Sequence, residues 1–99
     1  MRITGFEWDK GNSRKSEEKH DVSQSEAEQV FFNQPLLVLA DEEHSQQEMR
    51  YHALGRTNDT RLLHITFTLR VTGSLILVIS ARDMHRKERI VYEKSQKNP

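Results

Sequence analysis

Residues 62–82 have the sequence LLHITFTLRVTGSLILVISAR and hold the clearest structural pattern in the chain. Apolar side chains occupy every second position of the first part, which predicts a strand over 62–70 with one buried face. Gly73 marks a turn, and the nearly continuous apolar run after it predicts a central strand over 74–81. The stretch therefore predicts two neighbouring antiparallel strands at the centre of a sheet.

Further strands are predicted on both sides of this pair. Residues 50–56 place Tyr51, Ala53 and Gly55 on one face, and Asn58-Asp59 is typical of a hairpin turn. The apolar run LLVLA at 36–40 predicts a buried strand, and the polar residues 41–47 are interpreted as a loop. Near the N-terminus, the alternation of Phe6 and Trp8 predicts a short first strand.

Three helices complete the expected order. Ser23 and Glu26 form a capping box in front of an apolar face, which predicts a helix over 23–32. Residues 10–20 are polar nearly all round, so a helix there should lie on the surface. A last helix is predicted over 84–93 with Asp83 as its cap, followed by a flexible tail over 94–99.

The predicted order is β-α-α-β-β-β-β-α. Strands joined by short turns, with the helices segregated in sequence, favour an α+β fold. We expect a single small domain over residues 1–93, with three helices and a mostly antiparallel sheet of about four or five strands.

Composition narrows the function classes. The chain of 99 residues has no cysteine, which excludes disulfides and cysteine-based metal or redox sites. Its four glycines and lack of GxSxG, Walker and GxGxxG motifs argue against nucleotide-dependent chemistry and acyl transfer. No apolar run reaches the ~20 residues that span a bilayer, and the first ten residues lack the apolar core of a signal peptide, so we expect a cytoplasmic protein with no membrane partner.

Charge is divided unevenly along the chain. Residues 1–49 carry 5 Lys+Arg and 11 Asp+Glu, a net −6, whereas residues 50–99 carry 10 and 4, a net +6. Four arginines flank predicted strands and could converge at one edge of the sheet; they are Arg50, Arg56, Arg70 and Arg82. Such a cluster can bind RNA phosphates and stabilise a phosphorane without a metal. Alternatively, these arginines pair with Asp41, Glu48 or Asp83 and only hold loops.

The five histidines show no metal-ligating spacing, so we expect neither a metal nor a cofactor. His44 and Glu48 are four residues apart but fall in a predicted loop. We expect His52 and His64 to be half-exposed sheet residues. His20 differs because it follows Lys19 at a helix end, where it can act as a proton shuttle or complement the helix dipole.

Three groups of short sequence motifs, taken in order along the chain, resemble the BrnT family of ribonuclease toxins. The first is FEWD at 6–9 with KHDVS at 19–23. The second is DEEHS at 41–45 with EMRYHALGR at 48–56. The third is FTLR at 67–70 with ISAR at 79–82, followed by ER at 88–89 and YE at 92–93. The ordered set spans residues 5–93 and is more specific than any one motif.

This resemblance implies a compact toxin related to RelE-like ribonucleases, which cleave RNA without a metal and arrest growth. It also implies a cognate BrnA-like antitoxin that neutralises the toxin in a higher-order complex and supplies the contact with operator DNA. The site residues that it implies are Lys19, His20, Glu48, Arg50, Arg70 and Arg82. In this hypothesis Glu48 or His20 is the general base, His20 or Lys19 the acid, and the three arginines hold the scissile phosphate.

The chain departs from the family pattern at several positions. The family usually has Lys at Asn12, Asn at Ser16, Gly at Asp21 and Phe at Gln24, and often has Arg at Leu77. Two interpretations follow: a weakened or lost nuclease, or an N-terminal helix that serves the antitoxin interface. The alternatives to an endoribonuclease are a non-catalytic module that binds RNA or an acidic protein segment, and a structural subunit that is stabilised by its partner.

Overall fold

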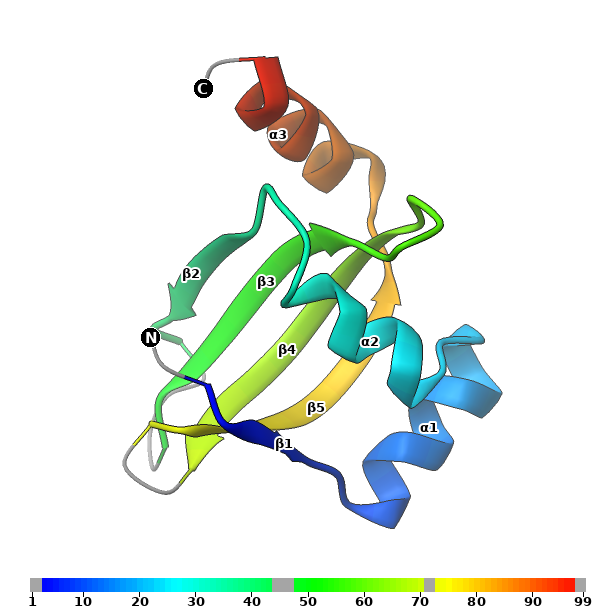
Figure 1. Cartoon of the computed structure of the whole chain (residues 1–99), viewed down its shortest axis with the longest axis vertical. Coiled ribbons are helices and arrows are strands. Elements are labelled where there is room, and N and C mark those ends of the chain that lie inside the picture. The colour runs from blue at the N-terminus through cyan, green and yellow to red at the C-terminus, as the bar shows by residue number, and fades with distance from the viewer. Residues whose placement is uncertain (1–2, 44–47, 71–72, 98–99) are drawn as a thin grey trace.

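The computed structural model describes residues 3–43, 48–70 and 73–97, and in this part of the chain it holds three helices and one five-stranded sheet (Figure 1). In chain order the elements are β1 (Gly5–Glu7), α1 (Lys10–His20), α2 (Gln24–Val30), β2 (Leu37–Asp41), β3 (Arg50–Arg56), β4 (Leu62–Arg70), β5 (Leu75–Asp83) and α3 (Arg86–Lys97). The predicted order of strands and helices, and the α+β class, are confirmed.

The sheet has the strand order β1-β5-β4-β3-β2. Strands β2 to β5 form consecutive antiparallel pairs, and β1 adds to the far side of β5 in parallel. The long central strands β4 and β5 are the pair predicted from residues 62–82, with Gly73 in the turn at φ +86°, a conformation that glycine adopts without a steric penalty.

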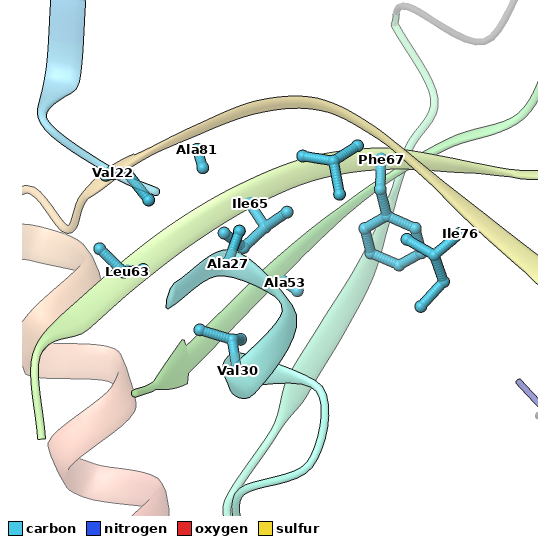
Figure 2. Close-up of a cluster of buried hydrophobic side chains, with 10 residues drawn as sticks. Val22, Ala27, Val30, Ala53, Leu63, Ile65, Phe67, Ile76 and Ala81 are labelled. Atoms are coloured by element: carbon cyan, nitrogen blue, oxygen red, sulfur yellow. The ribbon is translucent and has the colours of Figure 1, made fainter. Parts of the chain in front are cut away.

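The main core lies between α2 and one face of the sheet (Figure 2). Leu63, Ile65 and Phe67 alternate along β4 and are fully buried against Ala27 and Val30 of α2. The capping box starts α2 as predicted, because Ser23 accepts from the backbone N–H of Glu26 and Glu26 accepts from that of Ser23. We call this covered surface the helix face of the sheet.

Helix α1 covers the outer edge of β5. It has no apolar stripe, but Ser16 is 2% exposed, and its Oγ accepts a hydrogen bond of 3.2 Å from the backbone N–H of Ala81. The residues of β5 that extend beyond its pairing with β1 lie at an edge of the sheet, where backbone N–H groups lack a partner on a neighbouring strand. The Ser16 hydroxyl of the covering helix supplies an acceptor for the N–H of Ala81. Most of α1 lies at the surface, as expected.

Strand β2 differs from its prediction. It is the terminal strand of the sheet, with Val38, Leu39 and Ala40 exposed, not the buried strand expected from the run LLVLA. A continuous apolar run predicts burial on both faces, but in this sheet no further strand pairs with β2 among the described residues.

The C-terminal helix begins later and ends later than predicted. Asp83 is the last residue of β5 and binds Arg61, so its prediction as the helix cap is wrong. Helix α3 starts at Arg86 and continues past Glu93 to Lys97, where it includes part of the predicted tail. Tyr92 anchors α3: its ring is fully buried near Leu54 and Met84, and its hydroxyl donates to Pro35 O at 2.8 Å.

The helices in the described ranges are too short or too polar to cross a lipid bilayer. His44 and most of the loop predicted over 41–47 lie outside the described residues.

Candidate functional site

The face of the sheet turned away from α2 carries most of the predicted site residues. Because side chains alternate along a strand, the residues between the core positions of β4 point to this side. The strand register then aligns Arg50 and His52 of β3, and Arg82 of β5, with the same face. We call it the open face and define it by Asp41, Arg50, His52, His64, Thr66, Thr68, Arg70 and Arg82. Helix α3 packs over one end of it, at Leu37 and Leu54.

One end of the open face brings together three predicted site residues: Glu48, Arg50 and Arg70. Arg70 forms an ion pair with Glu48 at 3.2 Å, with both side chains about half exposed. Arg50 lies between Thr68 and Asp41 in the register. Thr68 donates to Met49 O at 2.7 Å, which ties the entry of β3 to β4. A carboxylate and two guanidinium groups therefore lie together at this partly exposed end of the open face.

Arg82 lies at the other end, under α3. Its guanidinium donates two bonds to the carboxylate of Glu88, at 2.8 and 3.0 Å. Burial acts to raise the pKa of Glu88, but the bonds from Arg82 and from the backbone N–H of His85 outweigh it and lower the pKa to about 2. The pair is a bidentate one that fixes the planar guanidinium on the sheet.

Two histidines lie between these ends. His52 Nε2 is 2.9 Å from Asp41 Oδ2, and its Nδ1 is 3.1 Å from Thr66 Oγ1. The His52 and His64 rings pack with their centroids 4.8 Å apart. His52 is half-exposed as predicted, whereas His64 is only 8% exposed, so its predicted half-exposure is wrong.

His64 is kept neutral by its surroundings. Burial is the main cause that lowers its pKa to about 4, and the charge of Arg82 adds to it. Its Nε2 is 3.8 Å from Glu88 Oε2, and no group in the described ranges hydrogen-bonds its buried Nδ1.

Lys19 and His20, the other two predicted site residues, lie at the end of α1 and not on the open face. Arg61 holds this end: it donates to the carbonyls of His20 and Asp21 at 3.3 and 2.7 Å, and binds the Asp83 carboxylate through Nε at 2.8 Å. Its guanidinium lowers the pKa of Asp83, with a smaller effect from His20. Arg61 is not among the predicted site residues, although it directly precedes β4 much as the predicted arginines flank their strands.

The structure shows where two of the residues lie that differ from the pattern implied by the resemblance. Asp21 has φ +53°, a left-handed conformation that favours the glycine usual at this position. Leu77 pairs with Thr68 in the register and so lies on the open face, at the position where the resemblance to BrnT implies an arginine.

The fourth arginine predicted at a strand end, Arg56, donates to Gln34 O at 2.9 Å. Arg70 pairs with Glu48, one of the predicted acidic partners, whereas Arg82 pairs with Glu88 instead. Arg50 and Arg70 lie at one end of the open face and Arg82 at the other, so the predicted convergence at one edge is limited to Arg50 and Arg70. Three or more His, Asp or Glu side chains do not gather into a metal-ligating group anywhere in the described ranges. Guanidinium groups, a carboxylate and an imidazole on one surface can bind a phosphodiester and move protons.

Comparison with known proteins assigns the family. The model of the family described as "Ribonuclease toxin, BrnT, of type II toxin-antitoxin system" matches residues 8–88. Among solved structures, the ribonuclease toxin BrnT of Brucella abortus matches with a TM-score of 0.62 and 19% identity, over 83% of this chain and 97% of that one. That likeness is one of fold. No curated protein matches. On the strength of the family match, which covers most of its length, the chain belongs to the BrnT family of ribonuclease toxins of type II toxin–antitoxin systems.

Proposed function

We propose that this chain is a metal-independent endoribonuclease whose open face cleaves RNA and thereby arrests growth. The observation that carries the proposal is the placement of Arg50, Arg70 and Arg82 on one surface with Glu48 and two histidines. Cleavage through the 2′-hydroxyl needs a base, a proton source for the leaving oxygen and cationic stabilisation of the phosphorane. Side chains of these three kinds are present on the open face.

In the proposed reaction, Arg50 and Arg70 bind the phosphate at the bond that breaks, and Arg82, at the other end of the open face, attracts a more distant phosphate of the RNA. The Glu48–Arg70 pair is half-exposed, so an RNA phosphate can replace the carboxylate on Arg70, and the freed Glu48 is then one candidate for the base. Lys19 and His20 act as proton donors only for an RNA that passes around the end of β5, since they belong to α1. Arg82 is held by Glu88 and offers a fixed positive charge.

The partner of a type II toxin is an antitoxin, and we propose that a BrnA-like antitoxin neutralises this chain in a higher-order complex. Within that complex, the antitoxin would supply the contact with operator DNA. Leu39, which pairs with His52 in the register, and Met49, which precedes β3, support a protein contact on this side of the sheet, because they are 65% and 51% exposed. An antitoxin segment that covers them would also block the arginines. Co-expression with the cognate antitoxin should suppress cleavage, and Leu39→Asp should weaken that suppression; cleavage that the antitoxin leaves unchanged would contradict this part.

The test of the nuclease is incubation of the purified protein with RNA in EDTA. We expect products that end in a 2′,3′-cyclic phosphate and a 5′-hydroxyl, because the 2′-oxygen attacks the phosphorus and the 5′-oxygen leaves. Arg70→Ala should lose most of this activity. Arg86→Ala, which removes an exposed arginine at the start of α3, is the matched control and should cleave as the parent does.

Two outcomes would count against the proposal. Salt-sensitive RNA binding by the parent without cleavage would favour the non-catalytic binding module. Equal loss of activity in the Arg70 and Arg86 variants would show that overall charge, and not the open face, is responsible.

A further inference from the structure

We propose that His52, oriented by Asp41, is the proton-accepting catalytic residue of this chain. This inference rests on the proposed ribonuclease function and assigns the base within it. The residue was not among those that the family resemblance implied, and the structure places it at the middle of the open face.

The contacts of His52 are those of an oriented acid–base group. Asp41, whose side chain is 10% exposed, lies 2.9 Å from Nε2. An ionised carboxylate only accepts hydrogen bonds, so the neutral ring carries its proton on Nε2. The lone pair is then on Nδ1, where the Thr66 hydroxyl donates at 3.1 Å. The His52 side chain is 33% exposed, so solvent and ligands can reach it.

His52 lies between the arginines that we propose to bind phosphate. Along β3, Arg50 and His52 lie on the same face, and Arg70 follows Thr66 and Thr68 on β4. On the other side, the His52 ring packs on His64, beyond which lie Glu88 and Arg82. An RNA backbone bound to Arg50 of β3 at one end and to Arg82 of β5 at the other would pass beside His52.

The alternative bases are less well placed. Glu48 is paired with Arg70, the group that would bind the phosphate. His20 ends α1, beside Asp83 and away from the open face. His64 has a suitable position but is buried, with its pKa lowered to about 4, so it is a weak base.

The proposed step is balanced. The Thr66 hydroxyl rotates aside and the 2′-hydroxyl of the RNA takes its place at His52 Nδ1. The 2′-oxygen forms its bond to phosphorus while its proton passes to Nδ1, and the bond between phosphorus and the 5′-oxygen breaks. The 5′-oxygen takes a proton from water, and His52 returns its own to solvent. Asp41 stabilises the imidazolium that forms in between.

Single-turnover cleavage of RNA in EDTA, measured from pH 5 to 9, tests this role. Asp41 of β2, Arg50 of β3 and His64 of β4 face His52, with Glu88 and Arg82 behind His64, and all are unchanged in His52→Gln. This variant should lower the rate constant ~10²–10⁴-fold. It should also abolish the increase in rate that the parent shows as the pH is raised from the acid end of the range. Asp41→Asn should lower the rate less, and His85→Gln, an exposed histidine before α3, should change neither rate nor profile.

A second measurement does not depend on activity. The ¹⁵N shifts of the His52 ring should report the Nε2–H tautomer in the free protein at neutral pH, and the Nδ1–H tautomer would overturn the orientation by Asp41. If His52→Gln cleaves at the parental rate with the parental pH profile, the role of His52 is wrong and the ribonuclease function stands. If the parent itself cleaves no RNA, the proposed function and this role fail together.

Discussion

At the scale of single residues, His64 is a polar side chain of the open face whose burial destabilises the fold. It lies between the apolar residues Leu63 and Ile65, so the strand pattern sends it to the opposite side of the sheet. There, α3 and the Arg82–Glu88 pair enclose it, and its Nδ1 has no partner among the described groups. An unpaired buried polar atom is destabilising, and it persists here beside groups that we place in the active site.

The burial of His64 makes the stability of the protein depend on pH. Its pKa is about 4 in the folded state against an ordinary value of 6.5, so the unfolded chain takes up the proton first as the pH falls. The free energy of unfolding should therefore drop between about pH 6.5 and pH 4, by roughly 2–3 kcal/mol for this group. His64→Leu should flatten this part of the profile.

Urea unfolding of both proteins at a series of pH values measures the effect. The carboxylates titrate in both, so the difference between the two profiles isolates His64. Parallel profiles from pH 6.5 to pH 4 would show that His64 is not buried as described.

At the scale of elements, the packing of α2 on β3 depends on a glycine. A Cβ built on Gly55 would lie 2.5 Å from Cγ1 of Val30 and 3.3 Å from its carbonyl oxygen. Both residues are buried, and Val30 belongs to the core that α2 closes. The close approach of helix and strand thus requires the smallest residue at position 55.

Gly55→Ala should lower the free energy of unfolding by about 1–3 kcal/mol, because the interior is already filled. Val30→Ala alone should also destabilise the protein, by leaving a cavity. The double variant should cost clearly less than the sum, since the smaller side chain makes room for the new methyl group. Additive costs in chemical denaturation would mean that the two residues do not meet.

Most of the elements could be predicted from local patterns. The alternation over 62–70 and the capping box at Ser23 are short-range signals, and both are confirmed. The exposure of β2 and the burial of Ser16 could not be predicted, because they depend on which strand ends the sheet and on which helix covers β5. The same is true of Asp83, whose partner Arg61 is distant in sequence.

The candidate site could be predicted in part. The arginines at strand ends were recognised by type and position, and strand alternation brings Arg50 and Arg70 to one face. His52 was missed as a site residue because its significance lies in Asp41, which reaches it across the β2–β3 pair. That contact depends on the strand register, which no local pattern in the sequence specifies.

At the scale of the whole molecule, the charge of the chain has a functional arrangement. The second half, with a net charge of +6, supplies β3, β4 and β5, and hence the arginines of the open face. The first half, with −6, supplies α1, α2 and β2. A chain with no net charge can therefore still gather arginines on one face, where they can contact a polyanion.

RNA binding should accordingly depend on salt. Three phosphate contacts to a single strand correspond to a slope of about −2 in a plot of log affinity against log salt. Arg70→Ala should reduce the steepness of that slope by about 0.7, and Arg86→Ala should leave it unchanged. Fluorescence anisotropy with a 2′-O-methyl RNA, which cannot be cleaved, measures these slopes. An affinity independent of salt would contradict an arginine-based site.

The location of bound RNA is the most direct test of the open face as the functional surface. Nuclear magnetic resonance spectra of the protein should be recorded with and without the 2′-O-methyl RNA. We predict shifts for Thr66, Leu77 and the other residues of the open face, with α2 unaffected. Shifts confined to α1 and α2, with the resonances of β3 and β4 unchanged, would contradict the assignment of the site.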